Sequence, residues 1–363
     1  MVDSTAKPLV VITGVTGFLG SQVLSEFVRG EGKDKYRVRA TVRDATAQNS
    51  KWLNALKAHF AAELDQIEFV SVELTNAQQI DNAVKGADYV VHTASPVGAN
   101  PANPDDMIQP AVQGVTSVVK SSQKHKVKRV VITSSIAAIT VLPEEDNDYE
   151  YNESHWSHPD LTNTAYIKSK TLAERAAWDL QELWKKQNVD CPELVTICPS
   201  FIMGESICTG AQTSTTLVRQ MVMNQLYAYP PVRFNMVDIK DCSLAHVRAL
   251  ERADAANKRF ILSQEHDVPM IELGNMLYDG LHQKGYNYPM TRRQIGYCTA
   301  KFASYFSAEA AFILPMCNKP ARTFHNERSR EVLGIEYRRN VPELLIETAE
   351  SLMKNGTIPT QRR

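Results

Sequence analysis

The stretch that decides the fold is Leu9-Val10-Val11-Ile12-Thr13-Gly14-Val15-Thr16-Gly17-Phe18-Leu19-Gly20, and the amphipathic run Ser21–Val28 follows it directly. The apolar residues before Gly14 predict a short strand, and the glycines then recur with the spacing G-x-x-G-x-x-G where a helix begins. Glycine at such a turn lets the backbone approach a pyrophosphate, whose charge is favoured by the free N–H groups of the first helical turn. The stretch therefore predicts a dinucleotide-binding unit, and the alternative is a tight turn without a ligand.

Outward from this stretch, short apolar runs alternate with helix-length segments over the first two hundred residues. Runs such as Val130-Val131-Ile132 are continuously apolar, as expected for strands buried on both faces, and strands separated by helices imply right-handed crossovers in a parallel sheet. The predicted strands are Leu9–Thr13, Tyr36–Val42, Ile67–Val72, Asp88–Thr93, Val127–Thr133 and Leu194–Pro199. The fold class is therefore α/β, a doubly wound parallel sheet of the Rossmann type with a smaller C-terminal substrate lobe.

The end of the second strand indicates which dinucleotide is bound. Val42-Arg43-Asp44 lies about 23 residues beyond Gly20, where this fold contacts the adenosine ribose. An arginine there suits a 2′-phosphate, because its planar fork can bind the oxyanion bidentately, whereas an acid favours a free 2′-hydroxyl. Arg43 therefore predicts NADP(H). Asp44 leaves NAD(H) open, and an ordinary surface charge is the other interpretation of Arg43.

The regular pattern loosens after Pro199 and returns with a further strand-like run, Arg259–Ser263. We therefore expect two parts in the chain. Residues 7–200 and 237–265 are predicted to form the NADP(H)-binding Rossmann domain, and residues 201–236 and 266–363 the substrate-binding lobe.

Composition excludes several classes of protein. The 363 residues are 43% hydrophobic and 22% charged, which excludes collagen-like, low-complexity and wholly disordered chains. A net charge of -1, from 40 basic and 41 acidic residues, offers no electrostatic footprint for nucleic acid or an anionic membrane. We expect a small-molecule carbonyl substrate as the partner, no nucleic acid or membrane, and a monomer or homodimer.

The cysteines and the termini bear on the compartment. The six cysteines lie far apart without a C-x-x-C pair, which favours reduced thiols over disulfides or a structural zinc site. Met1–Pro8 lacks the apolar run of a signal peptide, and Phe302–Cys317 is too short to span a membrane and is broken by Glu309 and Pro315. His155 and His158 have no acidic or cysteine cluster to complete a metal site. We therefore expect a cytoplasmic protein without a bound metal.

A tyrosine and a lysine suggest the chemistry. Tyr166 and Lys170 lie four residues apart, on one face if Thr164–Lys186 is helical. A tyrosine is a poor acid–base catalyst near neutral pH unless a neighbouring positive charge stabilises its phenolate, and Lys170 could supply that charge.

The spacing alone is weak evidence, because Tyr297 and Lys301 repeat it. The predicted strand Val127–Thr133 ends in Ser134-Ser135 about thirty residues before Tyr166, so a serine hydroxyl could reach the same site. Tyr297 has no such strand end upstream. We therefore predict that Tyr166 is catalytic and that Tyr297 is structural.

With these residues together, the chain resembles an extended short-chain dehydrogenase/reductase, of the branch that contains dihydroflavonol reductases, cinnamoyl-CoA reductases and fungal aldehyde or ketone reductases. The resemblance covers nearly the whole chain. It rests on Thr13–Gly20, Arg39–Asp44, Val91–Pro96, Val130–Ser135, Tyr166–Lys170, Pro199–Gly204 and the returning segment Val237–His246.

The resemblance implies roles for the matching positions. Ser135, with Ser134 as the alternative, would hydrogen-bond the substrate carbonyl, and Tyr166 would donate the proton. Lys170 would hold the nicotinamide ribose and lower the pKa of the tyrosine. Pro199 and Phe201 would flank the nicotinamide, and Ser214 could reach the pyrophosphate. The predicted cofactor contacts are Gly14, Gly17, Phe18, Leu19, Gly20, Arg43, Glu73, Leu74, Thr93, Ala94, Ser95, Tyr166, Lys170, Pro199, Phe201 and Ser214.

Four positions depart from the family pattern. Glu73 replaces the usual aspartate near the adenine, and Asn49 stands where a lysine often assists the residue equivalent to Arg43. Thr140 occupies the place of the substrate-binding asparagine of dihydroflavonol reductases, and Asn163–Lys170 lacks the signature of cinnamoyl-CoA reductases. Neither plant substrate is therefore expected.

These observations predict an NADPH-dependent reductase of aldehyde or ketone groups on small organic substrates, with a hydride from nicotinamide C4 and a proton from Tyr166. A NAD-dependent sugar-nucleotide epimerase or dehydratase, or a hydroxysteroid dehydrogenase, shares the fold and the Tyr/Lys pair, but Arg43 argues against it. A non-catalytic NADP(H)-sensing regulator is the third hypothesis. The complete set of Ser135, Tyr166 and Lys170 argues against a sensor, which needs no proton donor.

Overall fold

The computed structural model describes residues 7–47, 50–96, 101–144, 147–208 and 213–362. Its centre is a sheet of seven strands, all parallel, in the order β11-β7-β5-β4-β1-β2-β3. These strands are β1 (Leu9–Thr13), β2 (Arg37–Val42), β3 (Ile67–Ser71), β4 (Tyr89–His92), β5 (Arg129–Thr133), β7 (Glu193–Pro199) and β11 (Lys258–Leu262). Each predicted strand is present within one or two residues of its expected ends, and the predicted fold class is confirmed.

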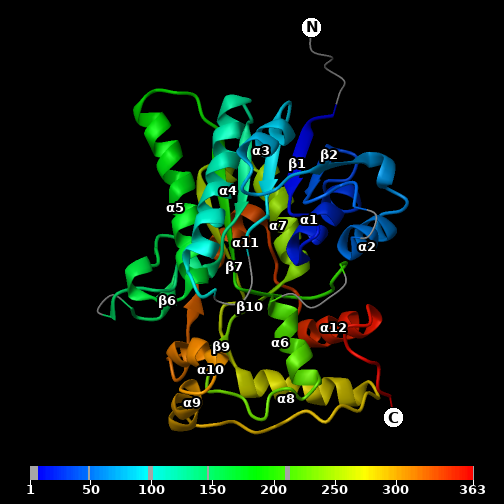
Figure 1. The fold of residues 1–363 in the computed structure, drawn as a ribbon, viewed down its shortest axis with the longest axis vertical. Helices are drawn as coiled ribbons and strands as arrows, with labels where there is room; N and C mark the ends of the chain where they lie inside the picture. The colour runs from blue at the N-terminus through cyan, green and yellow to red at the C-terminus, as the bar shows by residue number, and fades with distance from the viewer. Residues whose placement is uncertain (1–6, 48–49, 97–100, 145–146, 209–212, 363) are drawn as a thin grey trace.

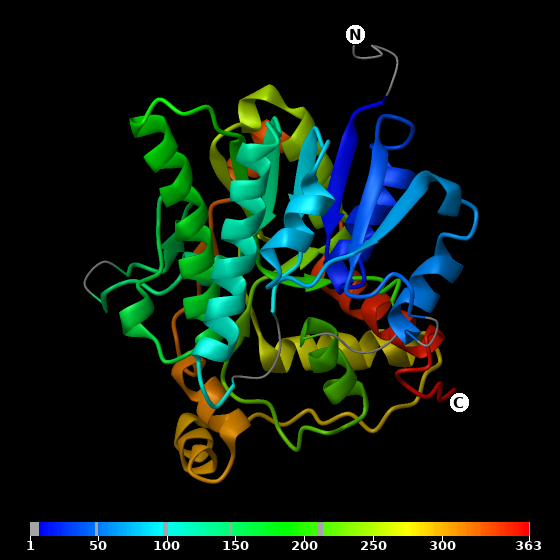
Figure 2. The same cartoon turned by 45° about the horizontal axis from the view of Figure 1, so that its top comes forward.

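Helices cover both faces of this sheet (Figures 1 and 2). The helices are α1 (Phe18–Val28), α2 (Lys51–His59), α3 (Ala77–Val84), α4 (Asp105–Lys124), α5 (Ala165–Lys186), α6 (Thr213–Val222), α7 (Ile239–Glu251), α8 (Met270–Gln283), α9 (Tyr297–Ser304), α10 (Ala308–Ile313), α11 (Glu327–Leu333) and α12 (Val341–Lys354). Helix α4 packs against α3 and α5 over one face, and α1 packs against α7 over the other.

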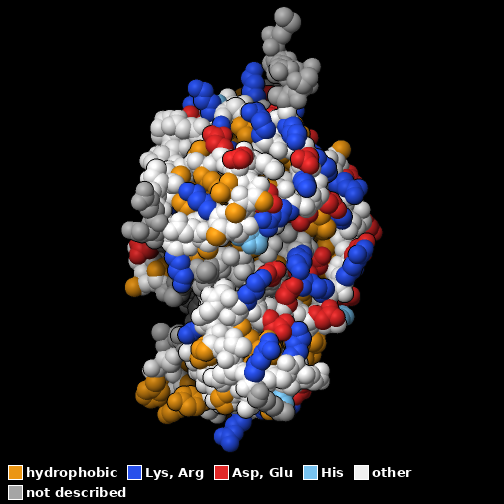
Figure 3. Space-filling model, turned by 90° about the vertical axis from the view of Figure 1, so that its right-hand side faces the viewer, with side chains coloured by type: hydrophobic (Ala, Val, Ile, Leu, Met, Phe, Trp, Pro, Cys, Tyr) orange, Lys and Arg blue, Asp and Glu red, His pale blue; other side chains and the backbone are white. Residues whose placement is uncertain are grey.

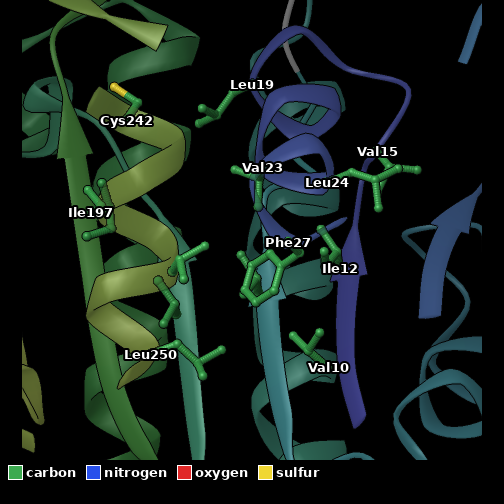
Figure 4. Packing of buried hydrophobic residues seen from close by; sticks show 14 of the residues in the cluster. Val10, Ile12, Val15, Leu19, Val23, Leu24, Phe27, Ile197, Cys242 and Leu250 are labelled. Atoms are coloured by element: carbon green, nitrogen blue, oxygen red, sulfur yellow. The ribbon is translucent and has the colours of Figure 1, made fainter. Parts of the chain in front are cut away.

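The continuous apolar runs have a simple cause, because alternate residues of each strand face opposite sides of the sheet. In β1, Val10 and Ile12 belong to the buried cluster under α1 and α7, whereas Leu9 and Val11 belong to the cluster under α3, α4 and α5. Figure 4 shows the first of these clusters, with Phe27 of α1 beside the sheet. Both faces of a central strand must therefore be apolar.

Helix α1 begins three residues earlier than the predicted Ser21, at Phe18. Gly17 is its N-cap, so the third glycine of the motif, Gly20, lies inside the first turn. The motif is thus both the turn and the start of the helix, because a glycine in this first turn allows close packing of the helix on the strand.

A second buried cluster lies below the sheet in Figure 1, where α6, α8 and α12 pack together. Short strands join it to the rest of the chain: β8 (Phe201–Met203) pairs with β10 (Met236–Asp238), β9 (Arg233–Phe234) with β12 (Val268–Pro269), and β6 (Glu150–Tyr151) with β13 (Thr323–Phe324). Because β7 leads almost directly into β8, the carboxyl ends of the parallel strands face this lobe.

The division into two domains stays a prediction. The residues of the second cluster all come from the segments assigned to the lobe, 201–236 and 266–363. Cys208, Leu333 and Ile335 are exceptions to that assignment, because they pack in the cluster under α1 and α7.

The surface carries both signs of charge, and Figure 3 shows Lys and Arg interspersed with Asp and Glu over one face. Among the residues that the structure describes, no helix is both long enough and apolar enough to cross a bilayer.

Candidate active site

The turn between β1 and α1 is closed by contacts that only glycine permits. Gly14 has a φ of +74°, and a Cβ there would lie 2.8 Å from the backbone of Ala94. A Cβ on Gly20 would lie 2.2 Å from the carbonyl oxygen of Gly14. The Gly17 amide donates to that same oxygen at 2.9 Å. Glycines 14 and 20 thus set the shape of the turn.

The first turn of α1 is open to an anion. Among the described residues, no side chain caps this turn, and it contains no Asp or Glu. The amides of Phe18, Leu19 and Gly20 lie at this positive helix end, where intrahelical partners are missing. The side chains of Phe18 and Leu19 are buried in the core. Any contact that these two residues make with a pyrophosphate must therefore come from the main chain.

The end of β4 is fixed against the same turn. The Thr93 hydroxyl donates to the Thr13 carbonyl oxygen at 2.6 Å, and the Ala94 amide donates to the Thr13 hydroxyl at 3.2 Å. Ser95 follows and is half-buried. The structure thus brings the predicted contacts Thr93, Ala94 and Ser95 beside the glycine turn.

The two charged residues after β2 differ in their availability. Arg43 is exposed, and it has no hydrogen bond or ion pair within the described part of the chain. The Asp44 carboxylate accepts hydrogen bonds from the Thr46 amide at 2.8 Å and the Thr46 hydroxyl at 2.7 Å, and these bonds lower its pKa. Arg43 is therefore free to bind an anion, whereas Asp44 is already engaged. Asn49 lies outside the described residues.

Glu73 and Leu74 follow the neighbouring strand β3. Glu73 is exposed, and its amide donates to the Gln79 side chain at 2.7 Å. Leu74 packs so closely on α4 that a Cβ on Gly114 would lie 2.5 Å from its side chain. A hydrogen bond of 2.9 Å from Ala45 to Ser71 joins the ends of β2 and β3. The ends of β2 and β3 therefore lie side by side, as an adenosine site requires.

The two serines after β5 have different surroundings. The Ser134 hydroxyl donates to the buried carboxylate of Glu174. Ser135 begins the short helix η2 (Ile136–Ala138), where its hydroxyl accepts from the Ala137 amide at 3.1 Å. The Ser135 side chain lies close enough to the Tyr166 phenol to lower its pKa. The geometry thus favours Ser135 over Ser134 as the hydroxyl that acts with the tyrosine.

Lys170 lies one turn beyond Tyr166 on the same helix, as the spacing predicts. Its Nζ is 6.0 Å from the centre of the Tyr166 ring and donates to the Thr133 carbonyl oxygen at 3.4 Å. The structure therefore brings Ser135, Tyr166 and Lys170 together at the carboxyl end of β5. The other Tyr/Lys pair, Tyr297 and Lys301, lies on α9 in the lobe.

The expected lowering of the tyrosine pKa by the lysine is not found. Burial raises the pKa of Tyr166 above its ordinary value, and the hydrogen bond to Ser135 offsets only part of this effect. Burial also lowers the pKa of Lys170 to about 8, while nearby Cys198 and Glu174 act in the opposite direction. Burial thus dominates the pKa of both groups, and the phenol is protonated near neutral pH.

The remaining predicted contacts lie at the end of β7 and in the lobe. Pro199 is the last residue of β7, and the Phe201 ring lies 5.1 Å from the Phe234 ring. Ser214 is buried in the first turn of α6. Ile197 of β7 pairs with Thr133, the last residue of β5, so Pro199 and Ser135 each follow a paired position by two residues.

Several polar side chains at this edge were not predicted. Ser200, the Asn235 amide and Nε2 of His92 are buried, and none has a hydrogen-bond partner among the described residues. Burial lowers the pKa of His92 to about 3, so this imidazole is neutral. No sequence signal marks these groups, because their burial depends on the packing of β4, β8 and β10.

Glu174 and Arg259 form the other feature that sequence reasoning missed. Arg259 Nε lies 2.7 Å from Glu174 Oε1, and both side chains are buried. A signal was available, because Glu174 lies four residues after Lys170 and hence on the catalytic face of α5.

The weaker candidates have structural surroundings. His246 hydrogen-bonds to the Thr133 hydroxyl at 2.8 Å and to the Cys242 carbonyl oxygen at 2.7 Å. His155 accepts a hydrogen bond from the amide of Asn152 at 3.3 Å, and His158 is exposed. No three His, Cys, Asp or Glu side chains within the described ranges are grouped as metal ligands would be.

Comparison with known proteins identifies the group of proteins to which this arrangement belongs. Residues 10–262 match the sequence profile of the NAD dependent epimerase/dehydratase family. The chain belongs to that family. Within it, the chain is 28% identical to cinnamoyl-CoA reductase 1 of Petunia hybrida over 99% of this chain and 97% of that protein. It is 29% identical to a (2S)-flavan-3-ol-forming anthocyanidin reductase of Vitis vinifera, over 72% of this chain and 78% of that protein.

The fold of this family member is also that of solved structures. The yeast methylglyoxal/isovaleraldehyde reductase Gre2, solved in complex with NADPH, superposes with a TM-score of 0.74 at 23% identity, over 96% of this chain and 99% of that one. The resemblance to extended short-chain dehydrogenase/reductases of the cinnamoyl-CoA reductase branch is confirmed, and this family member is an oxidoreductase.

Proposed function

We propose that the chain is an NADPH-dependent reductase of aldehyde or ketone groups on small organic substrates. The observation that carries this proposal is the placement of the Tyr166 phenol beside the Ser135 side chain, with Lys170 one helical turn away. A protonated phenol beside a second hydroxyl is suited to polarise a carbonyl oxygen and protonate it.

Three features support NADPH as the cofactor. The first turn of α1 offers uncapped main-chain amides, which suit the negative charge of a pyrophosphate. Within the described part of the chain Arg43 has no partner while Asp44 is engaged, which favours a 2′-phosphate over a 2′-hydroxyl. Gre2, whose fold the chain shares, is complexed with NADPH.

The residues of the chain then have separate tasks. When bound, NADPH supplies the hydride from C4 of its nicotinamide. Ser135 donates a hydrogen bond to the carbonyl oxygen, and Tyr166 transfers its proton to that oxygen as negative charge develops there. Lys170, held by the Thr133 carbonyl, binds the ribose hydroxyls and stabilises the phenolate that remains.

The alternatives have weaker support. The family as described includes NAD-dependent epimerases and dehydratases, which share the Tyr/Lys pair, but the free Arg43 and the engaged Asp44 argue for NADP(H). The relatives compared above are named as reductases of different substrates, so they support the carbonyl chemistry and no single substrate. A sensor without activity would need none of the Ser135, Tyr166 and Lys170 geometry.

The test is NADPH oxidation with a panel of aliphatic and aromatic aldehydes, α-dicarbonyls and ketones. We expect turnover by the wild type, a preference for NADPH over NADH, and a loss of about a hundredfold or more in rate with Tyr166→Phe, while NADPH binding is kept. Tyr297→Phe is the matched control and should keep the wild-type rate. Near-wild-type turnover by Tyr166→Phe would contradict the assignment, and binding of NADPH without any turnover would favour the sensor.

We also propose a cytoplasmic location, with the chain active as a monomer or homodimer. All six cysteines are free thiols, which supports a reducing compartment.

A further inference from the structure

A buried ion pair lies directly behind the catalytic groups. The Glu174 side chain is 1% exposed and the Arg259 side chain 8%, and their charged atoms meet at 2.7 Å. Burying two charges is costly unless every remaining donor and acceptor is satisfied, and replacement by apolar residues often stabilises a protein. Such a pair in a reductase core therefore suggests a role beyond stability.

The Glu174 carboxylate connects elements that carry the site. It accepts from Ser134, the residue before the catalytic Ser135, and from the Thr196 hydroxyl of β7 at 2.7 Å. It also accepts from the Trp178 indole at 3.3 Å. One carboxylate on α5 therefore connects the end of β5 with the middle of β7.

Arg259 extends this connection to the loop that precedes α5. Its guanidinium donates to the carbonyl oxygens of Glu153 at 2.8 Å and His155 at 2.6 Å. The same group stacks 3.7 Å from the centre of the Trp156 ring. Glu174 thus has a fixed counter-ion, and its orientation is set by β11 and this loop.

Glu174 also acts on Lys170 through its charge. The two residues lie one turn apart and line the same small crevice between α4, α5 and the ends of β4 and β5. The titratable side chains that influence Lys170 are Tyr166 and Glu174 from its own helix, His92 from β4 and Cys198 from β7.

Only one of these four neighbours is charged near neutral pH. Burial raises the pKa values of Tyr166 and Cys198 and lowers that of His92, so all three are neutral. Although burial alone would raise the pKa of Glu174, Arg259 and the hydrogen bonds hold it below its ordinary value. Of the two groups that raise the pKa of Lys170, Cys198 is thus a neutral thiol near neutral pH, and Glu174 is the one that carries a negative charge.

We propose that Glu174, held by Arg259, is a positioning residue of the active site, which sets Ser135 through Ser134 and maintains the charge of Lys170. This inference rests on the proposed function for the roles of Ser135 and Lys170. In this proposal Glu174 acts through Ser134 and Lys170.

The first test compares two hydroxyls that bond to the same buried carboxylate. Ser134→Ala and Thr196→Val each remove one hydrogen bond to Glu174, but only Ser134 adjoins the catalytic serine. We expect kcat to fall about tenfold for Ser134→Ala with KM for NADPH unchanged, and to stay within about twofold for Thr196→Val, because small displacements of reacting groups are costly. Equal losses of kcat in the two variants would overturn the positioning role, as would a larger loss in Ser134→Ala than in Ser135→Ala.

The second test uses Glu174→Gln and follows NADPH affinity against pH by nucleotide fluorescence, without turnover. The affinity for NADPH should weaken at alkaline pH, where Lys170 loses its charge. In Glu174→Gln this decrease should begin about half a pH unit or more lower, because the negative charge that favours protonated Lys170 has been removed. Glu193→Gln is the matched control, since Glu193 pairs with Arg129 at 2.7 Å at the opposite ends of β5 and β7. In Glu193→Gln the alkaline decrease in NADPH affinity should occur at the same pH as in the wild type.

The outcomes separate this inference from the proposed function. A wild type that binds NADPH but reduces no carbonyl compound contradicts the proposed function, whereas the pH dependence of NADPH affinity still tests Glu174. If that pH dependence is identical in the wild type and Glu174→Gln, Glu174 does not maintain the charge of Lys170. If Glu174→Gln does not fold, thermal unfolding shows this, and the comparison of Ser134→Ala with Thr196→Val decides the inference.

Discussion

The ammonium of Lys170 lies 3.4 Å from the carbonyl oxygen of Thr133, the last residue of β5. This contact holds the second turn of α5 against the end of the strand that precedes Ser135. The Lys170 side chain is buried where it makes this bond to the main chain.

The burial of Lys170 predicts the alkaline limit of activity. Its pKa is lowered to about 8, so the ammonium is charged below that pH and loses its charge above it. We expect kcat/KM for carbonyl reduction by NADPH to be constant from about pH 6 to 7.5 and to fall tenfold per unit above about pH 8. Tyr166 does not set this limb, because burial raises its pKa. A profile that stays flat to pH 9.5 would contradict this role for Lys170.

Arg43 should decide the choice between the two nicotinamide cofactors. Arg43→Gln removes the fork that would bind the 2′-phosphate, so we expect KM for NADPH to rise about tenfold to a hundredfold with little change for NADH. Arg37→Gln is the control, because Arg37 lies at the other end of β2. Steady-state rates with both cofactors measure the effect. An equal increase in KM for NADPH and for NADH would show that Arg43 does not bind the 2′-phosphate.

The glycine turn should not accept a methyl group at position 20. A Cβ on Gly20 would lie 2.2 Å from the Gly14 oxygen and 2.7 Å from the Thr93 hydroxyl, so β1 and α1 must separate. We expect Gly20→Ala to lower the free energy of unfolding by about 2 kcal/mol or more and to weaken NADPH binding about tenfold. Urea unfolding and fluorescence titration measure the two effects.

Gly296→Ala provides the comparison for this change. A Cβ on Gly296 meets no described atom within 4 Å, so we expect a loss of less than about 1 kcal/mol. The role of close packing at Gly20 would be refuted by similar unfolding free energies for the two variants.

Buried His246 should make the fold sensitive to acid. Burial lowers its pKa in the folded chain to about 4, whereas the unfolded chain takes up the proton near the ordinary value of 6.5. Between these two pKa values the unfolded state binds more protons than the folded state. The free energy of unfolding therefore decreases as the pH falls from 6.5 towards 4, and above this window the titration of His246 no longer affects it. The contribution of His246 is about 3 kcal/mol.

Urea unfolding between pH 4.5 and 7.5 measures this dependence. The free energy of unfolding should change less with pH in His246→Gln than in the wild type. This comparison of slopes holds even if the substitution also changes the stability at every pH. His158→Gln, at an exposed histidine, should keep the wild-type slope. Identical slopes in all three proteins would mean that His246 is not held neutral by the fold.

Local features of the sequence were sufficient to predict much of this protein. The apolar run before Gly14 and the glycine spacing predicted β1, the turn and α1, because strands, turns and helix starts depend on neighbouring residues. The spacing of Tyr166 and Lys170 likewise predicted that they share a face of α5, since helical neighbours are four residues apart. Their roles rest on the resemblance and remain proposals.

Tertiary structure decided the surroundings that give these residues their properties. Arg259 is 85 residues from Glu174 along the chain, and Ser134 is 40 residues from it, so no local pattern could pair them. The pKa of Tyr166 is raised where the sequence led us to expect it lowered, because burial depends on packing from several elements at once. The chain's short-range patterns thus determined which elements form and where the candidate groups stand, whereas desolvation and long-range hydrogen bonds, which exist only in the packed fold, decided how those groups are held and charged.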